Sequence, residues 1–121
     1  MSWRLLLSAL LCIPAGCAGS MDGAFYWPGG RDHLSDSMAL TLAAGSAERV
    51  VLRAPGGPDL DGVWLPQPDG GRGTVVYCHG NSRNWTFFLE RVHWYWRAGY
   101  QLLAFDYRGF GASEGVPTRE G

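Results

Sequence analysis

The fold of this chain is decided by the stretch Val75-Val76-Tyr77-Cys78-His79-Gly80-Asn81 and by a second one further on, Leu103-Ala104-Phe105-Asp106-Tyr107-Arg108-Gly109-Phe110-Gly111. Each stretch is apolar over the length of a strand and then ends abruptly in small and polar residues. A buried strand that brings a glycine-containing turn to the edge of a sheet is how α/β proteins place backbone N–H groups beside a reacting atom. The two stretches therefore indicate consecutive strands of an α/β sheet.

The segment from Thr74 to Tyr107 has the pattern of one βαβ unit. Thr74–Cys78 is predicted to be a buried strand, because its residues are largely apolar and β-branched. Asn84 is expected to cap the helix that follows, and Gly99 to end it in the left-handed conformation. Gln101–Asp106 is then expected to be the next, parallel strand of the unit.

The helix between these strands is expected to be amphipathic and to pack against the sheet. Its apolar residues recur at helical spacing and define the predicted sheet-facing stripe: Trp85, Phe88, Leu89, Val92 and Trp96. The opposite, wetter side is expected to carry Arg83, Glu90 and Arg97. The charged residues exclude a membrane-spanning helix, so core packing explains the aromatic content.

Two shorter β-type runs, Arg49–Ala54 and Gly62–Leu65, precede the βαβ unit. Gly56–Asp59 separates them, which predicts an antiparallel hairpin. The fold class is therefore α/β, a hairpin followed by a βαβ unit of a mostly parallel sheet. At 121 residues the chain is expected to hold an incomplete, N-terminal part of such a fold, which usually needs about 200–250 residues.

The N-terminal residues are typical of an export signal. Arg4 precedes the apolar run Leu5–Ile13, which is too short to span a bilayer. Ala15-Gly16-Cys17 resembles a bacterial lipobox, although Pro14 stands where that motif prefers Leu, Val or Ile. The resemblance implies a lipidated Cys17 and an exported protein anchored to a membrane of the bacterial cell envelope. The alternative is cleavage after Ser20 by an ordinary signal peptidase.

This interpretation divides the chain into a signal peptide (1–16), a lipidated N-terminus with a tether and a leading loop (17–46), and the α/β body (47–121). One aromatic cluster, Phe25-Tyr26-Trp27-Pro28, interrupts the tether. Two explanations are open for it: a clip at the membrane interface, or packing against the body where the chain reaches it.

Composition narrows the possible partners. The net charge of −1 and the absence of a basic patch argue against nucleic acid. The cysteines, Cys12, Cys17 and Cys78, do not form a disulfide framework, and Cys78 is expected to be a small buried hydrophobe. No spacing of His, Cys, Asp and Glu suggests a metal site, and no cofactor is expected.

From about Val50 to Thr118 the sequence resembles the α/β-hydrolase superfamily, and within it the serine aminopeptidase-like branch. The resemblance rests on the hairpin, on the strand followed by His79-Gly80-Asn81, on the aromatic helix, and on the run that begins at Asp106. It implies that the backbone N–H of Asn81 serves in an oxyanion hole. Gly80 is expected to let the backbone turn without a Cβ clash.

The resemblance also assigns structural roles. The catalytic His of the superfamily comes from a loop near the C-terminus, so His79 is expected to orient the turn by hydrogen bonding. Asp106 precedes any plausible nucleophile, so we expect it to pair with Arg108 and fix the loop that contains Gly109 and Gly111.

Gly111-Ala112-Ser113-Glu114-Gly115 fits the G-x-S-x-G pattern of a nucleophile elbow. An elbow needs a strand, a tight turn and then a helix, whereas here the strand has ended before the motif and Pro117 follows it. The order Ser, acid, His also requires a downstream His, and none follows His93. Ser113 is therefore not expected to be the nucleophile.

These observations predict a serine hydrolase that acts on an ester, amide or related acyl bond of a small molecule. In this reading the chain carries the oxyanion turn, and the nucleophile, acid and base lie elsewhere in a longer protein. Two alternatives are a non-catalytic lipoprotein that reuses the scaffold for binding, and lyase, haloalkane or peroxidase-type chemistry on the same fold. No pattern in the sequence defines the acyl substrate or the oligomeric state.

Overall fold

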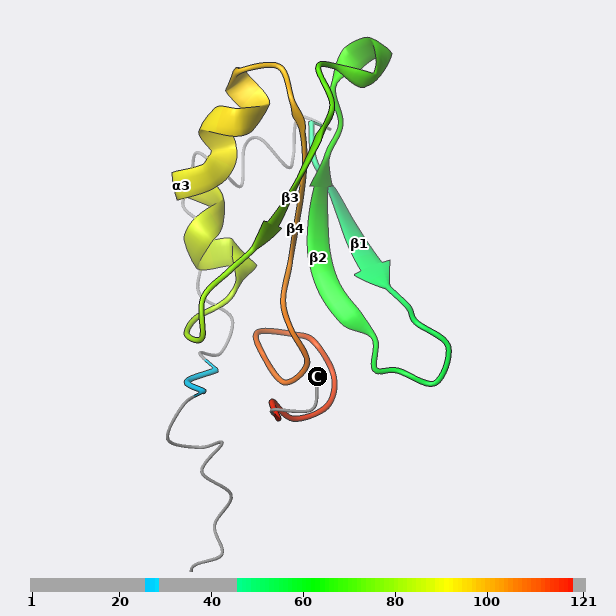
Figure 1. Cartoon of the computed structure of the whole chain (residues 1–121), viewed down its shortest axis with the longest axis vertical. Helices are drawn as coiled ribbons and strands as arrows, with labels where there is room; N and C mark the ends of the chain where they lie inside the picture. The colour runs from blue at the N-terminus through cyan, green and yellow to red at the C-terminus, as the bar shows by residue number, and fades with distance from the viewer. Residues whose placement is uncertain (1–25, 29–45, 119–121) are drawn as a thin grey trace, which may run out of the picture.

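The computed structural model describes residues 26–28 and 46–118. The signal peptide, Cys17 and most of the tether lie outside the described residues, so those predictions stay predictions. The described body has four strands and one helix (Figure 1), with a short 3-10 turn at Pro68–Gly70. In chain order the elements are β1 (Glu48–Leu52), β2 (Leu60–Leu65), β3 (Thr74–Cys78), α3 (Trp85–Arg97) and β4 (Gln101–Phe105).

The strands form one mixed sheet in the order β1-β2-β4-β3. The pairs β1–β2 and β2–β4 are antiparallel, and β3–β4 is parallel. The predicted hairpin and the predicted βαβ unit are both confirmed, and β3 has the expected bounds. Because β2 runs antiparallel to β4, the loop between β1 and β2 lies at the same edge of the sheet as the carboxyl ends of β3 and β4.

The helix α3 begins and ends where the sequence predicts. The Asn84 side chain accepts a hydrogen bond from Phe87 N at 3.2 Å, which satisfies one of the free N–H groups of the first turn. Gly99 follows the helix with φ of +91°, a conformation that favours glycine. Among the described residues, no helix is both long enough and apolar enough to cross a membrane.

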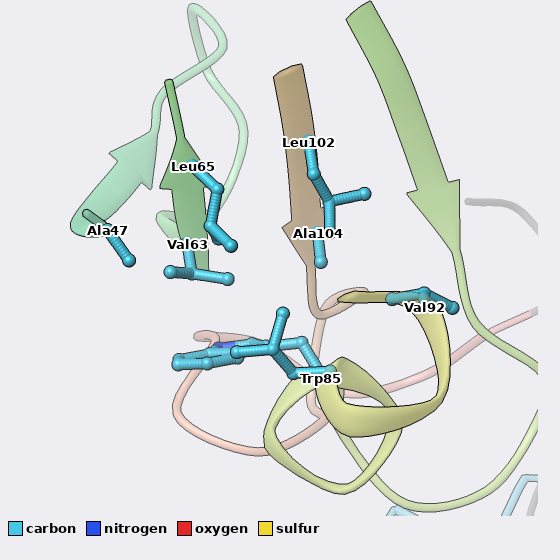
Figure 2. Close-up of a cluster of buried hydrophobic side chains, with 8 residues drawn as sticks. Ala47, Val63, Leu65, Trp85, Val92, Leu102 and Ala104 are labelled. Atoms are coloured by element: carbon cyan, nitrogen blue, oxygen red, sulfur yellow. The ribbon is translucent and has the colours of Figure 1, made fainter. Parts of the chain in front are cut away.

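The core lies between α3 and one face of the sheet (Figure 2). Leu102 and Ala104 of β4 pair with Leu65 and Val63 of β2, so their side chains share that face. The helix contributes the other large members of the core: Trp85, Leu89 and Val92. Trp96 of the predicted stripe packs at the rim of this core, whereas Phe88 stacks on the ring of His79.

The expectation that β3 is a buried strand is wrong. Within the described residues β3 pairs only with β4, and no helix covers the face of the sheet away from α3 (Figure 1). Val76 on that face is 55% exposed, and Cys78 is exposed rather than buried. A continuous apolar run shows that a strand can be buried on both faces, but it does not show which elements cover it.

Candidate active site

The glycine-containing turn follows β3 directly and is held from two sides. The Tyr107 hydroxyl, beyond β4, donates a hydrogen bond to the carbonyl of His79 at 2.8 Å. On the other side, Trp27 N donates to Asn81 O at 2.9 Å, and Arg83 N donates to Trp27 O at 3.2 Å. A segment far away in the sequence therefore binds the backbone on both sides of Ser82, as a short parallel bridge.

The aromatic cluster near Trp27 thus packs against the body where it can be described. The ring of Tyr26 meets that of Phe110 edge to face at 6.5 Å, whereas the Trp27 side chain is 63% exposed. Packing of Tyr26 supports the second of the two explanations that the sequence left open. Trp27 binds the turn through its backbone N–H and carbonyl.

Gly80 does not have the role expected of it. A Cβ at this position would meet no atom within 4 Å, and its φ lies outside the left-handed region. No contact with other parts of the described chain therefore requires glycine. Because Gly80 has no side chain, the space beside the turn stays open, and a ligand could approach the backbone closely there.

His79 lies in a closed aromatic environment, and its side chain is 0% exposed. Its Nδ1 atom is 2.6 Å from the carbonyl oxygen of Gly80, so the ring contacts the turn that it precedes. Phe88 stacks on one side at 6.0 Å between centroids, and the rings of Tyr107 and Phe110 lie at 4.5 and 5.2 Å. The imidazole is thus held in one place by packing.

Asp106, at the end of β4, is also buried, with 1% of its surface exposed. Its Oδ1 atom accepts the backbone N–H of Trp85 at 2.5 Å and lies 3.3 Å from Nε2 of His79. The expected pairing with Arg108 is wrong, since the described residues contain no ion pair between them. The reason is the start of α3, where a free N–H group and the helix dipole favour a carboxylate.

The loop after β4 wraps closely around this carboxylate. Gly111 has φ of +53°, and a Cβ there would lie 2.0 Å from Oδ2 of Asp106. Gly109 has φ of +74°, and a Cβ there would lie 2.4 Å from Pro117. Both glycines are therefore required by close approach as well as by backbone conformation.

Ser113 ties the same loop to the sheet. Its hydroxyl accepts a hydrogen bond from Asp61 N at 2.9 Å and donates one to the carbonyl of Asp106, also at 2.9 Å. A nucleophilic serine donates its hydrogen to a general base, whereas this hydrogen is bound to a backbone carbonyl. The hydroxyl therefore ties β2 to the residue that follows β4, and these hydrogen bonds agree with the expectation that Ser113 is not the nucleophile.

Sequence reasoning missed one partly buried polar cluster at the start of α3. The Asp61 carboxylate accepts two hydrogen bonds from Arg49, each 2.7 Å long, and a third from Nε1 of Trp85 at 2.8 Å. This hydrogen-bonded carboxylate raises the pKa of Arg49 above its ordinary value. The sequence carried a signal for this ion pair, since an arginine and an aspartate stand on neighbouring strands of the predicted hairpin. In the observed register, residues 49 and 61 lie on the same face of the sheet, the one that packs on α3.

A groove of about 560 Å³ opens between the β1–β2 loop and the loop after β4. Its walls are mainly apolar and include Tyr26, Leu52, Pro58, Leu60, Tyr107 and Phe110. Its volume lies within the usual range of small-molecule sites. In the part of the chain that the structure describes, no group of three or more His, Cys, Asp and Glu side chains could hold a metal ion.

The described residues form part of an α/β-hydrolase fold, in which an antiparallel hairpin and a parallel βαβ unit share one mixed sheet. Among solved structures, an α/β-hydrolase from Vibrio vulnificus superposes with a TM-score of 0.58 and 18% identity, covering 76% of this chain and 32% of that one. The Pyrococcus furiosus esterase Pf2001 superposes with a TM-score of 0.57 and 20% identity, covering 78% of this chain and 35% of that one. These likenesses establish the fold.

The curated relatives share a higher sequence identity with the chain than these solved structures do, and they are uncharacterized proteins. The chain is 34% identical over 102 residues to the uncharacterized protein YfhR of Salmonella typhimurium, covering 81% of this chain and 32% of the relative. It is 34% identical over 73 residues to the uncharacterized protein Rv2307c of Mycobacterium tuberculosis, covering 60% of this chain and 26% of that protein. No protein-family model matches. The chain thus spans about a third or less of the length of these curated relatives.

Proposed function

We propose that this chain is part of a serine hydrolase that cleaves an ester, amide or related acyl bond of a small molecule. The observation that carries the proposal is the turn after β3, whose backbone is fixed by Tyr107, His79 and Trp27. A fixed backbone N–H beside a reacting carbonyl stabilises the negative charge that develops on its oxygen. Similarity to a fold that includes an esterase supports the same reaction class.

In this proposal the backbone N–H of Asn81 is one donor of the oxyanion hole. The nucleophile, the base and the acid of the triad are supplied by the longer protein, as in the serine aminopeptidase-like branch that the sequence resembles. The open space at Gly80 supports close approach of a substrate to the turn, and Tyr107, which binds the carbonyl of His79, also lines the apolar groove.

The coding sequence provides the first test. A strand followed by Gly-x-Ser-x-Gly and a helix, and then by an acid and a His, should be encoded downstream of Gly121. The full-length product should react with a fluorophosphonate probe at that serine. Absence of the motif, or of labelling in folded protein, would contradict the enzyme and favour the non-catalytic binding module.

Asn81→Pro tests the oxyanion role directly, because proline has no backbone N–H. Loss of one oxyanion donor costs about 10²–10³ in kcat. Asn81→Ala changes the side chain and keeps the N–H, so it should lose far less. Equal losses in the two variants would contradict a role for the N–H.

We further propose that the protein is exported and held on a membrane through lipid attached to Cys17. The lipobox-like run supports this, and multiple acyl chains hold a protein stably on a bilayer. Metabolic labelling with a palmitate analogue should mark the wild type and not Cys17→Ser. Equal labelling of both would contradict the anchor.

A further inference from the structure

The hydrogen bond between His79 and Gly80 defines the state of the imidazole ring. A carbonyl oxygen only accepts, so Nδ1 of His79, 2.6 Å from Gly80 O, carries a hydrogen. The other nitrogen, Nε2, is 3.3 Å from the carboxylate of Asp106 and has no hydrogen-bond partner among the described residues.

The hydrogen bond to Gly80 also determines where Asn81 points its N–H. The carbonyl of Gly80 and the N–H of Asn81 belong to one planar peptide unit, and in a trans unit they point in opposite directions. A donor that holds the oxygen on the buried side therefore turns the N–H toward the opposite side. It also polarises the peptide, which strengthens the N–H as a donor.

Asp106 lies against the other nitrogen of the ring, 3.3 Å from Nε2. This carboxylate is held by Trp85 N at 2.5 Å, at the N-terminus of α3, and faces the free nitrogen of the ring. Phe88 and Phe110 close the two sides of the imidazole, so the ring has little freedom to rotate away. A chain of close contacts thus connects the start of α3, through Asp106 and His79, to the carbonyl of Gly80 beside Asn81.

We infer that Asp106 and His79 are a positioning pair that aims the Gly80–Asn81 peptide, a role that rests on the proposed function of that peptide as an oxyanion donor. The pair touches no substrate. It acts through the peptide, with Asp106 orienting the ring and the ring fixing the carbonyl.

Matched substitutions of His79 distinguish the contribution of Nδ1 from that of Nε2. The side-chain amide of His79→Asn places its nitrogen near the Nδ1 position, and that of His79→Gln near the Nε2 position. His79→Phe keeps the aromatic packing and removes both. In the full-length hydrolase we expect His79→Gln and His79→Phe to lower kcat by about 10–100-fold with little change in KM, and His79→Asn to recover at least half of that loss on a logarithmic scale.

Asp106→Asn is the matched test of the second member, since its amide oxygen can still accept the Trp85 N–H. We expect kcat to fall by about tenfold, with KM unchanged. His93→Phe is the control, a histidine on α3 whose ring stacks on Trp96 at 5.2 Å, away from the turn. It should leave kcat at the wild-type value, and thermal melting should show that all variants are folded.

NMR spectroscopy tests the positioning pair independently of enzymatic activity. In ¹⁵N-labelled full-length protein, the Nδ1 resonance of His79 should show a bound hydrogen that exchanges slowly with water. The amide resonance of Asn81 should move in His79→Gln and stay near its wild-type position in His79→Asn. A bare Nδ1, or equal effects of Asn and Gln, would overturn the positioning pair. A folded wild type that shows the expected resonances but is inactive and does not react with the fluorophosphonate probe would overturn the hydrolase proposal and leave the positioning pair standing.

Discussion

Replacement of Ser113 by alanine removes one hydroxyl and keeps the Cβ, so its effect can be worked out from two hydrogen bonds. The hydroxyl accepts from Asp61 N and donates to Asp106 O, each at 2.9 Å. A typical intramolecular hydrogen bond contributes about 0.5–1.5 kcal/mol net, so the pair is worth about 1–3 kcal/mol. The upper half of that range is expected, because Asp61 is only 8% exposed and its N–H would lose its partner.

Urea unfolding of the full-length protein, followed by far-UV circular dichroism, measures this loss. Ser46→Ala is the matched control at the start of the described body, and its free energy of unfolding should stay within about 0.5 kcal/mol of the wild type. Fluorophosphonate labelling of Ser113→Ala should persist wherever the protein is folded. An unchanged stability would refute the cross-link, and loss of labelling at unchanged stability would identify Ser113 as the nucleophile after all.

Three further predictions concern α3 and the loop after β4. Trp85→Phe removes the indole donor to the Asp61 carboxylate and should cost about 1.5–3 kcal/mol in urea unfolding, so a neutral result would contradict that bond. Gly111→Ala places a methyl group against Asp106 at a left-handed φ and should cost more than about 2 kcal/mol, measured as lost soluble protein and a lowered Tm; normal yield and Tm would contradict the close approach. Burial, and then a nearby arginine, lower the pKa of His93, so its contribution to stability is present above the ordinary pKa of about 6.5 and is lost as pH falls through the lowered folded value. Urea titrations from pH 7.5 to 5 should show this loss in the wild type and a smaller one in His93→Phe, and parallel curves would argue against it.

The elements of the body could be predicted because their signals are local. The cap at Asn84, the left-handed Gly99 and the apolar run of β3 each depend on a few neighbouring residues, and each lies where the sequence places it. The β1–β2 and β3–β4 pairings followed from the turn residues of the hairpin and from the length of the βαβ unit, whereas the antiparallel pairing of β2 with β4 was not predicted.

The contacts of the candidate site depend on partners far away in the sequence, so local patterns could not give them. Asp106 was expected to pair with a residue two positions on, whereas its partners come from the start of α3 and the end of β3. The bridge from Trp27 to the turn crosses more than fifty residues and carries no side-chain signal, because it uses backbone groups alone. The apolar character of β3 was read correctly as a strand and wrongly as burial, since burial depends on what else covers the strand.

The outer edge of β3 bears on how the protein can be produced. Within the described residues, this strand pairs on one side only, and it carries an exposed Val76. Unpaired backbone groups on an apolar edge are a template for a strand of another molecule. The 121-residue chain made by itself should therefore self-associate into β-rich aggregates. A charged residue in place of Val76 would make such strand addition less favourable and keep the isolated chain in solution.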